Sequence, residues 1–75
     1  MIDTAKLDGR IGACGMKMNY VASALGLTPE SLRMKRQNKT EFSITEITKL
    51  SRLLGTTTSE LIEDIFLPEK FNENE

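Results

Sequence analysis

Basic side chains give this chain its clearest capacity for chemistry, because the usual catalytic and metal-binding residue types are scarce. The chain has no histidine and a single cysteine, Cys14. It therefore cannot form an internal disulfide, a Cys/His zinc site or a histidine-assisted nucleophile. Lys35, Arg36 and Lys39, by contrast, lie within five consecutive positions, and such a cluster can bind an anion.

Charge is divided unevenly along the sequence. The net charge is −1, but residues 1–40 carry seven Lys and Arg against three Asp and Glu, a net +4. Residues 41–75 carry three Lys and Arg against eight Asp and Glu, a net −5. A small domain with this division is expected to present one face to an anion and another face to a different partner.

Length and composition limit what the chain can be. Its 75 residues make one domain, and a chain of this size buries only about 60% of its unfolded surface. So small a core leaves little room for an enclosed catalytic pocket, and we expect neither an enzyme nor a cofactor site. No apolar run approaches the roughly 18 residues of a membrane span, and Met1–Asp3 does not open a signal peptide. We expect a soluble, intracellular protein.

The first helix is predicted to begin at Asp3–Thr4, because either side chain can accept a hydrogen bond from a backbone N–H group of the first turn. Leu7, Ile11 and Cys14 follow at helical spacing. This stripe predicts that Cys14 is a small core residue rather than a redox group. Gly15 is suited to end the helix in the left-handed conformation.

Three glycines fall in or beside this helix, at positions 9, 12 and 15. Their spacing is not GxGxxG and no strand precedes them, so they do not predict a nucleotide-binding loop. Gly9 and Gly12 weaken a helix interior, and a use for them would be the close approach of another backbone.

The next twenty residues have the spacing of a helix-turn-helix: a helix over Met18–Leu25, then a helix capped by Thr28 that runs to Gln37. In this motif the first helix needs a small residue where the second helix packs against it, and Ala22 is that residue. The turn needs a residue that tolerates positive φ, and Gly26 supplies that. Asn38 suits a left-handed stop. Four apolar residues stand where the two helices must hold together: Val21, Leu25, Leu27 and Leu32.

Two further helices are predicted by their start signals. Ser43 and Glu46 form a capping box, and Phe42 with Ile47 forms the hydrophobic staple around it. Gly55 ends the helix that follows. Its apolar stripe is Ile47, Leu50 and Leu54, with Ile44 and Leu53 beside it.

Thr57 and Glu60 repeat the capping-box spacing and predict a fifth helix over residues 58–66, ended by Pro68. No strand pattern is present, so we expect an all-α fold of five helices. Residues 1–67 would form the domain, and residues 68–75 a short acidic tail.

The order and spacing of these motifs resemble those of phage Cro/repressor-type helix-turn-helix proteins, in particular the short Cro-like proteins of phages of Gram-positive bacteria. The matching segments are residues 6–11, 21–28, 38–47, 53–55 and 65–68. The resemblance implies a compact lambda-repressor-like domain that binds operator DNA, usually as a dimer, and represses transcription. Two positions depart from it: Met18 stands where members often have Gln, and Lys35 where many have an apolar residue.

The resemblance also implies which residues meet DNA, with the third helix in the major groove. Arg33 can donate two bonds to guanine, Glu30 can accept one from cytosine, and Met34 can touch a thymine methyl group. The expected base contacts are Thr28, Pro29, Glu30, Arg33 and Met34. The expected phosphate contacts are Lys17, Lys35, Arg36, Lys39 and the backbone near Asn38. The alternative for these residues is an ordinary solvated helix face.

Three apolar residues near the C-terminus have two interpretations. Phe66, Leu67 and Phe71 either close the base of the core or form a dimer contact. A symmetric dimer would place its two third helices about 34 Å apart, to match a pseudo-palindromic site. The rival to a DNA-binding function is a protein-interaction module, an antirepressor or an inhibitor of a host protein, that acts through the acidic C-terminal half.

Overall fold

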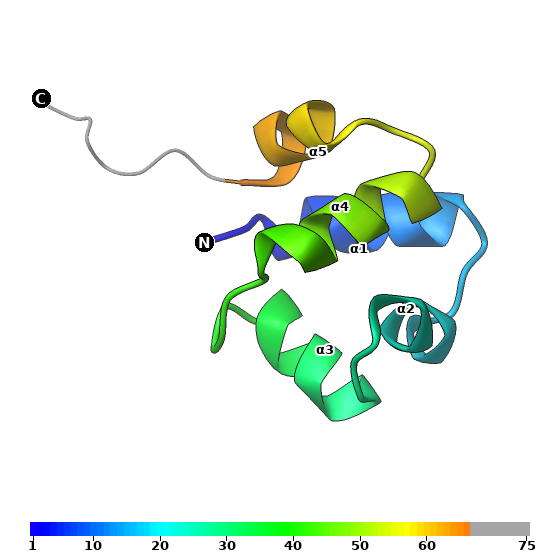
Figure 1. The fold of residues 1–75 in the computed structure, drawn as a ribbon, viewed down its shortest axis with the longest axis vertical. Helices are drawn as coiled ribbons and strands as arrows, with labels where there is room; N and C mark the ends of the chain where they lie inside the picture. Colours follow the sequence, from blue (N-terminus) through cyan, green and yellow to red (C-terminus); the bar gives the residue numbers. More distant parts are fainter. Residues whose placement is uncertain (67–75) are drawn as a thin grey trace, which may run out of the picture.

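The computed structural model describes residues 1–66, which form five helices and no sheet (Figure 1). The helices are α1 (Thr4–Ala13), α2 (Met18–Leu25), α3 (Pro29–Arg36), α4 (Ile44–Leu53) and α5 (Thr58–Ile65). The predicted all-α fold is confirmed, with helix ends within one or two residues of those expected.

Side-chain caps start the helices where the sequence predicts them. Asp3, Thr28, Ser43 and Thr57 each accept a bond from a backbone N–H group three residues further on. The capping box of α4 is complete, because the Ser43 N–H group also donates to Glu46 Oε1 at 2.9 Å. At α5 the box is half formed: Glu60 accepts from the Thr56 hydroxyl at 2.8 Å instead of from the Thr57 backbone.

Left-handed residues turn the chain at the predicted places. Gly26 has φ of 75° between α2 and α3, and Asn38 has φ of 65° after α3. An L-residue with a Cβ atom rarely adopts this conformation, and asparagine is among the few that do. The two turns therefore set where α3 begins and ends.

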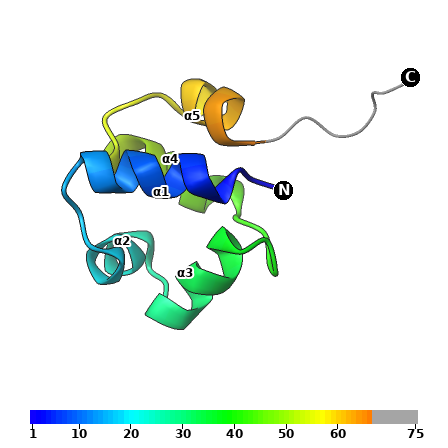
Figure 2. The ribbon, with the colours of Figure 1, turned by 180° about the vertical axis from the view of Figure 1, so that it is seen from behind.

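The helices form a layered arrangement. α1 and α4 lie in the middle, α5 lies on one side of them, and α2 with α3 lies on the other (Figures 1 and 2). α2 packs against α3 and α4, and α5 packs against α1 and α4. The core between them is formed by Ile2, Leu7, Ile11, Val21, Ala22, Leu25, Leu32, Ile47, Leu50, Leu61 and Ile65.

The N-terminal segment takes part in the fold in a way that the sequence did not predict. Ile2 is buried and forms an antiparallel bridge with Phe66, while the Asp3 N–H group donates to the Ile65 carbonyl at 2.6 Å. On the other side, the Asn38 side chain accepts from the Ile2 N–H group at 2.8 Å and donates to its carbonyl at 3.0 Å. This segment therefore joins the end of α3 to the end of α5.

Two expectations about individual residues are wrong. Cys14 is exposed, because α1 ends at Ala13 and the chain turns away before the stripe of Leu7 and Ile11 can continue. Ile44, beside the predicted stripe of α4, is 67% exposed in the first turn of that helix. Gly9 and Gly12 lie against no other backbone: a Cβ atom added at either would meet nothing within 4 Å.

Within residues 1–66, no helix is both long enough and apolar enough to cross a membrane.

The open space around Gly9 leads us to predict that an alanine there stabilises the protein. Gly9→Ala should raise the free energy of unfolding by about 0.5–1 kcal/mol, because alanine loses less backbone entropy in a helix interior than glycine. Gly15→Ala is the matched control: its surroundings are equally open, but its φ is 72°, so it should lower stability by about 1 kcal/mol. Urea unfolding of both variants measures the difference. A loss of stability in Gly9→Ala would contradict the prediction.

Candidate nucleic-acid interface

One face of α3 is turned to solvent. Glu30, Arg33 and Gln37 are exposed and spaced three and four residues apart, so they follow one another along the helix surface. Leu32, on the opposite face, is 1% exposed and belongs to the core. The helix is therefore held by one side and leaves the other side free to contact a ligand.

Arg33 is bonded to both of its neighbours on this face. Its Nε donates to Glu30 Oε1 at 3.2 Å and its Nη2 lies 2.5 Å from Glu30 Oε2. Its Nη1 lies 3.4 Å from Gln37 Oε1. About half of the Arg33 side-chain surface, 49%, is still exposed, so the guanidinium is oriented without being covered.

Of the other predicted base contacts, Thr28 and Pro29 lie at the start of the same helix and Met34 lies in its last turn. Thr28 is exposed, and its hydroxyl accepts from the Ser31 N–H group at 3.0 Å as the helix cap. Pro29 is exposed, while Met34 is half-buried. Gln37 was missed by the sequence analysis as a member of this face, although its spacing of four residues from Arg33 was a usable signal.

Lys35 is held against the start of α4. Its ammonium group donates to the Glu41 carbonyl at 2.7 Å and lies 3.2 Å from Glu46 Oε1, and 16% of its side-chain surface is exposed. The aliphatic part of a lysine can fill an apolar position while its charge is compensated at the tip. This contact explains how the chain accommodates Lys35 where an apolar residue was expected.

Arg36 is held against α1. It donates to the two carboxylate oxygens of Asp8 at 2.8 and 2.9 Å, and this hydrogen bonding raises the pKa of the Arg36 guanidinium. The Thr4 hydroxyl donates to the Arg36 carbonyl. Together with Lys35, Arg36 therefore fastens the last turn of α3 to the two helices behind it.

The backbone amides that follow α3 are not free to bind a phosphate. The backbone N–H groups of Asn38 and Lys39 donate to the carbonyls of Lys35 and Met34, at 3.1 and 2.9 Å, so these amides are already occupied.

Four exposed basic residues among residues 1–66 take part in no ion pair: Lys17, Lys39, Lys49 and Arg52. Lys17 directly precedes α2 and Lys39 follows α3, so these two flank the helix-turn-helix, whereas Lys49 and Arg52 lie on α4.

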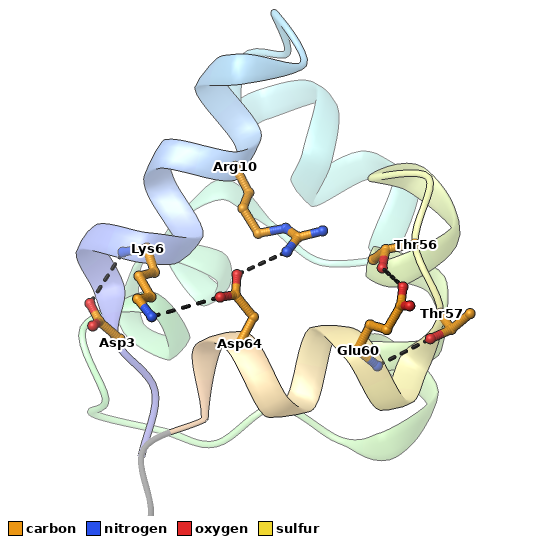
Figure 3. A network of polar contacts seen from close by, with 7 residues as sticks. All are labelled: Asp3, Lys6, Arg10, Thr56, Thr57, Glu60 and Asp64. Carbon is orange, nitrogen blue, oxygen red and sulfur yellow. Dashed lines mark hydrogen bonds and ion pairs between the residues drawn. The ribbon is translucent and has the colours of Figure 1, made fainter.

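A second group of ion pairs lies on the opposite side of the molecule, where α1 meets α5 (Figure 3). Asp64 lies 2.8 Å from Arg10 Nη1 and 3.7 Å from Lys6 Nζ. The hydrogen bond from Arg10 holds the pKa of Asp64 below its ordinary value, and the Thr56 hydroxyl does the same for the pKa of Glu60. Lys6 and Arg10, in the first half of the chain, thus form ion pairs with Asp64 in the second half.

Two short helices joined by a left-handed glycine, the second with an exposed arginine on its open face, define a helix-turn-helix of the kind that binds DNA. The family model described as the Cro/C1-type HTH DNA-binding domain matches residues 6–66. The chain belongs to this family, and the protein is a DNA-binding regulator. Members of the family are typically not enzymes. Comparisons with curated proteins and with solved structures find no match.

The contact between Lys35 and Glu46 gives the protein a pH-dependent stability. Burial alone raises the pKa of a carboxyl group, but hydrogen bonds from the Ser43 backbone and the Lys35 ammonium outweigh it and hold the pKa of Glu46 below its ordinary value. A carboxyl whose pKa is lowered by folding stabilises the fold above its unfolded pKa and loses this contribution as the pH falls through the folded pKa.

Glu46→Gln should therefore be less stable than the wild type at pH 7, by about 1 kcal/mol, and the difference should shrink below roughly pH 4. Urea unfolding at several pH values measures it. Glu63→Gln, at an exposed position of α5, is the matched control and should show little difference at any pH. A constant difference for Glu46→Gln between pH 7 and pH 3 would contradict the ion-pair explanation.

Proposed function

We propose that this protein is a Cro-like transcriptional repressor of phage origin that binds operator DNA in the bacterial cytoplasm. The observation that carries the proposal is the open face of α3, where Arg33 is oriented but half-exposed. A guanidinium can donate two hydrogen bonds to O6 and N7 of guanine, which discriminates that base by about 1–3 kcal/mol. Thr28 and Pro29, at the start of the same helix, and Met34, in its last turn, would contact the neighbouring bases.

We propose fewer phosphate contacts than the sequence suggested. Lys17 and Lys39 are exposed, flank the helix-turn-helix and lie outside the ion pairs of the described residues, so we assign the phosphate contacts to them. Lys35, Arg36 and Asn38 instead hold the last turn of α3 in place. Phosphate contacts fix the position of a protein on the duplex but read no sequence.

We further propose that the protein acts as a homodimer, with Phe66 in the contact surface. Phe66 is half-buried and lines a cleft of about 400 Å³. Met1, Ile2 and Phe42 form the rest of its apolar part, and Lys35, Asn38, Thr40 and Glu41 form its polar part. Met1 is 65% exposed, so a second chain can cover the apolar part. Leu67 and Phe71, the other two expected dimer residues, lie outside the described residues. Sedimentation at several protein concentrations tests the assembly.

The same cleft is the observation that favours the second candidate, a protein-interaction module. Binding to DNA distinguishes the two functions. A selection of random duplexes should enrich a palindrome if the protein is a dimeric repressor. Binding to that site should also weaken steeply with salt, because each contacted phosphate releases counterions. No shift of DNA in a gel at low salt would favour the protein-interaction module.

The two kinds of DNA contact predict different mutant behaviour. Arg33→Ala should relax the base preference at one position of the selected site, by about 1–3 kcal/mol. Lys39→Ala should weaken binding to all sequences about equally and reduce the salt dependence by about one phosphate contact. Lys6→Ala removes the same charge on the α1–α5 side of the molecule (Figure 3) and should change binding much less. Equal losses on operator and random DNA from Arg33→Ala would overturn the assignment.

A further inference from the structure

We propose that Glu30 and Gln37 are positioning residues: they hold the Arg33 guanidinium in place, and Arg33 alone reads the base pair. This inference rests on the proposed function and changes the expected role of Glu30, which sequence chemistry assigned to a cytosine of its own. The observation behind it is that Arg33 bonds to Glu30 through Nε and Nη2 and to Gln37 through Nη1.

The number of donors on Arg33 fits this role. A guanidinium has five N–H groups in a rigid plane. The two bonds to Glu30 and the one to Gln37 occupy one N–H group on each of the three nitrogens. One N–H group therefore remains on Nη1 and one on Nη2, and guanine offers two acceptors, O6 and N7, to such a pair.

The carboxylate of Glu30 is also bound in a way that limits its other uses. Both of its oxygens accept from Arg33, so a bond to a cytosine amino group would have to compete with an ionic partner. An exposed ion pair contributes little to stability in water. Its contribution to recognition is different, because an arginine that is already oriented loses less side-chain entropy when it meets the base.

Electrostatics predicts how substitutions of Glu30 and Arg33 should combine. A carboxylate that enters a groove lined by phosphates is repelled unless a cation compensates it. In the wild type, Arg33 compensates Glu30 at 2.5 Å. Removal of Arg33 alone would leave Glu30 facing the phosphates, and removal of both side chains would relieve this repulsion. The two substitutions should therefore not be additive.

The experiment compares the wild type, Glu30→Ala, Arg33→Ala and the double variant. Each is titrated against the selected duplex, against duplexes with single base-pair changes and against random DNA. Glu30→Ala should cause a several-fold loss of preference at the base pair where Arg33→Ala acts, and no further loss once Arg33 is absent. The double variant should bind random DNA more tightly than Arg33→Ala does. Gln37→Ala should cause a smaller loss at that base pair, because its bond to Arg33 is longer.

Glu63→Ala is the matched control. Glu63 is an exposed carboxylate of α5 outside the lining of the proposed dimer cleft, and its removal changes the charge by the same amount without touching Arg33. It should strengthen binding to all duplexes alike and leave base preference unchanged. Relaxed preference at a different base pair in Glu30→Ala, with additive effects in the double variant, would overturn the inference and restore Glu30 as a base contact.

A measurement without DNA separates this inference from the proposed function. In NMR spectra of the free protein, the Nε–H proton of Arg33 should exchange with water more slowly than that of Arg52, an exposed arginine of α4, and Glu30→Ala should remove this protection. An unprotected Arg33 in the wild type would overturn the positioning role whether or not the protein binds DNA. A protected Arg33 in a protein that enriches no duplex would retain the contact and refute the proposed repressor.

Discussion

The structure depends on one constraint: an eight-residue helix must leave one face open while it is held by the other. α3 buries Leu32 in the core and offers no second residue that is as fully buried. Apolar packing of one side chain cannot by itself fix the direction of a helix. The orientation of α3 is completed by polar contacts at its last turn, from Lys35 to α4 and from Arg36 to α1.

Asn38 extends this attachment to the chain terminus. Its left-handed backbone stops the helix, and its side chain forms a pair of hydrogen bonds with Ile2 of the kind that a neighbouring strand would form. Because Ile2 also pairs with Phe66, the position of α3 is tied to the end of α5. The surface proposed for DNA and the surface proposed for a second chain therefore share one structural connection.

Local motifs made most of the fold predictable. The caps at Ser43 and Thr57 and the turn at Gly26 act over three or four residues, so their effect can be derived from the sequence alone. The prediction for Cys14 failed because it assumed that a pattern continues past a helix end. Cys14 lies beyond the end of α1 and is exposed.

The sequence by itself determined the helices, their boundaries, the helix-turn-helix spacing and the open face that carries Arg33. Only the tertiary structure decided how the basic residues are used. Arg36 meets Asp8 across 28 positions of the chain, and Arg10 meets Asp64 across 54. Hydrophobic spacing and capping report on neighbours within a helix, whereas an ion pair between helices exists only after they have packed. For this reason the cationic first half appeared in the sequence as one binding face, and in the folded protein much of it holds helices together.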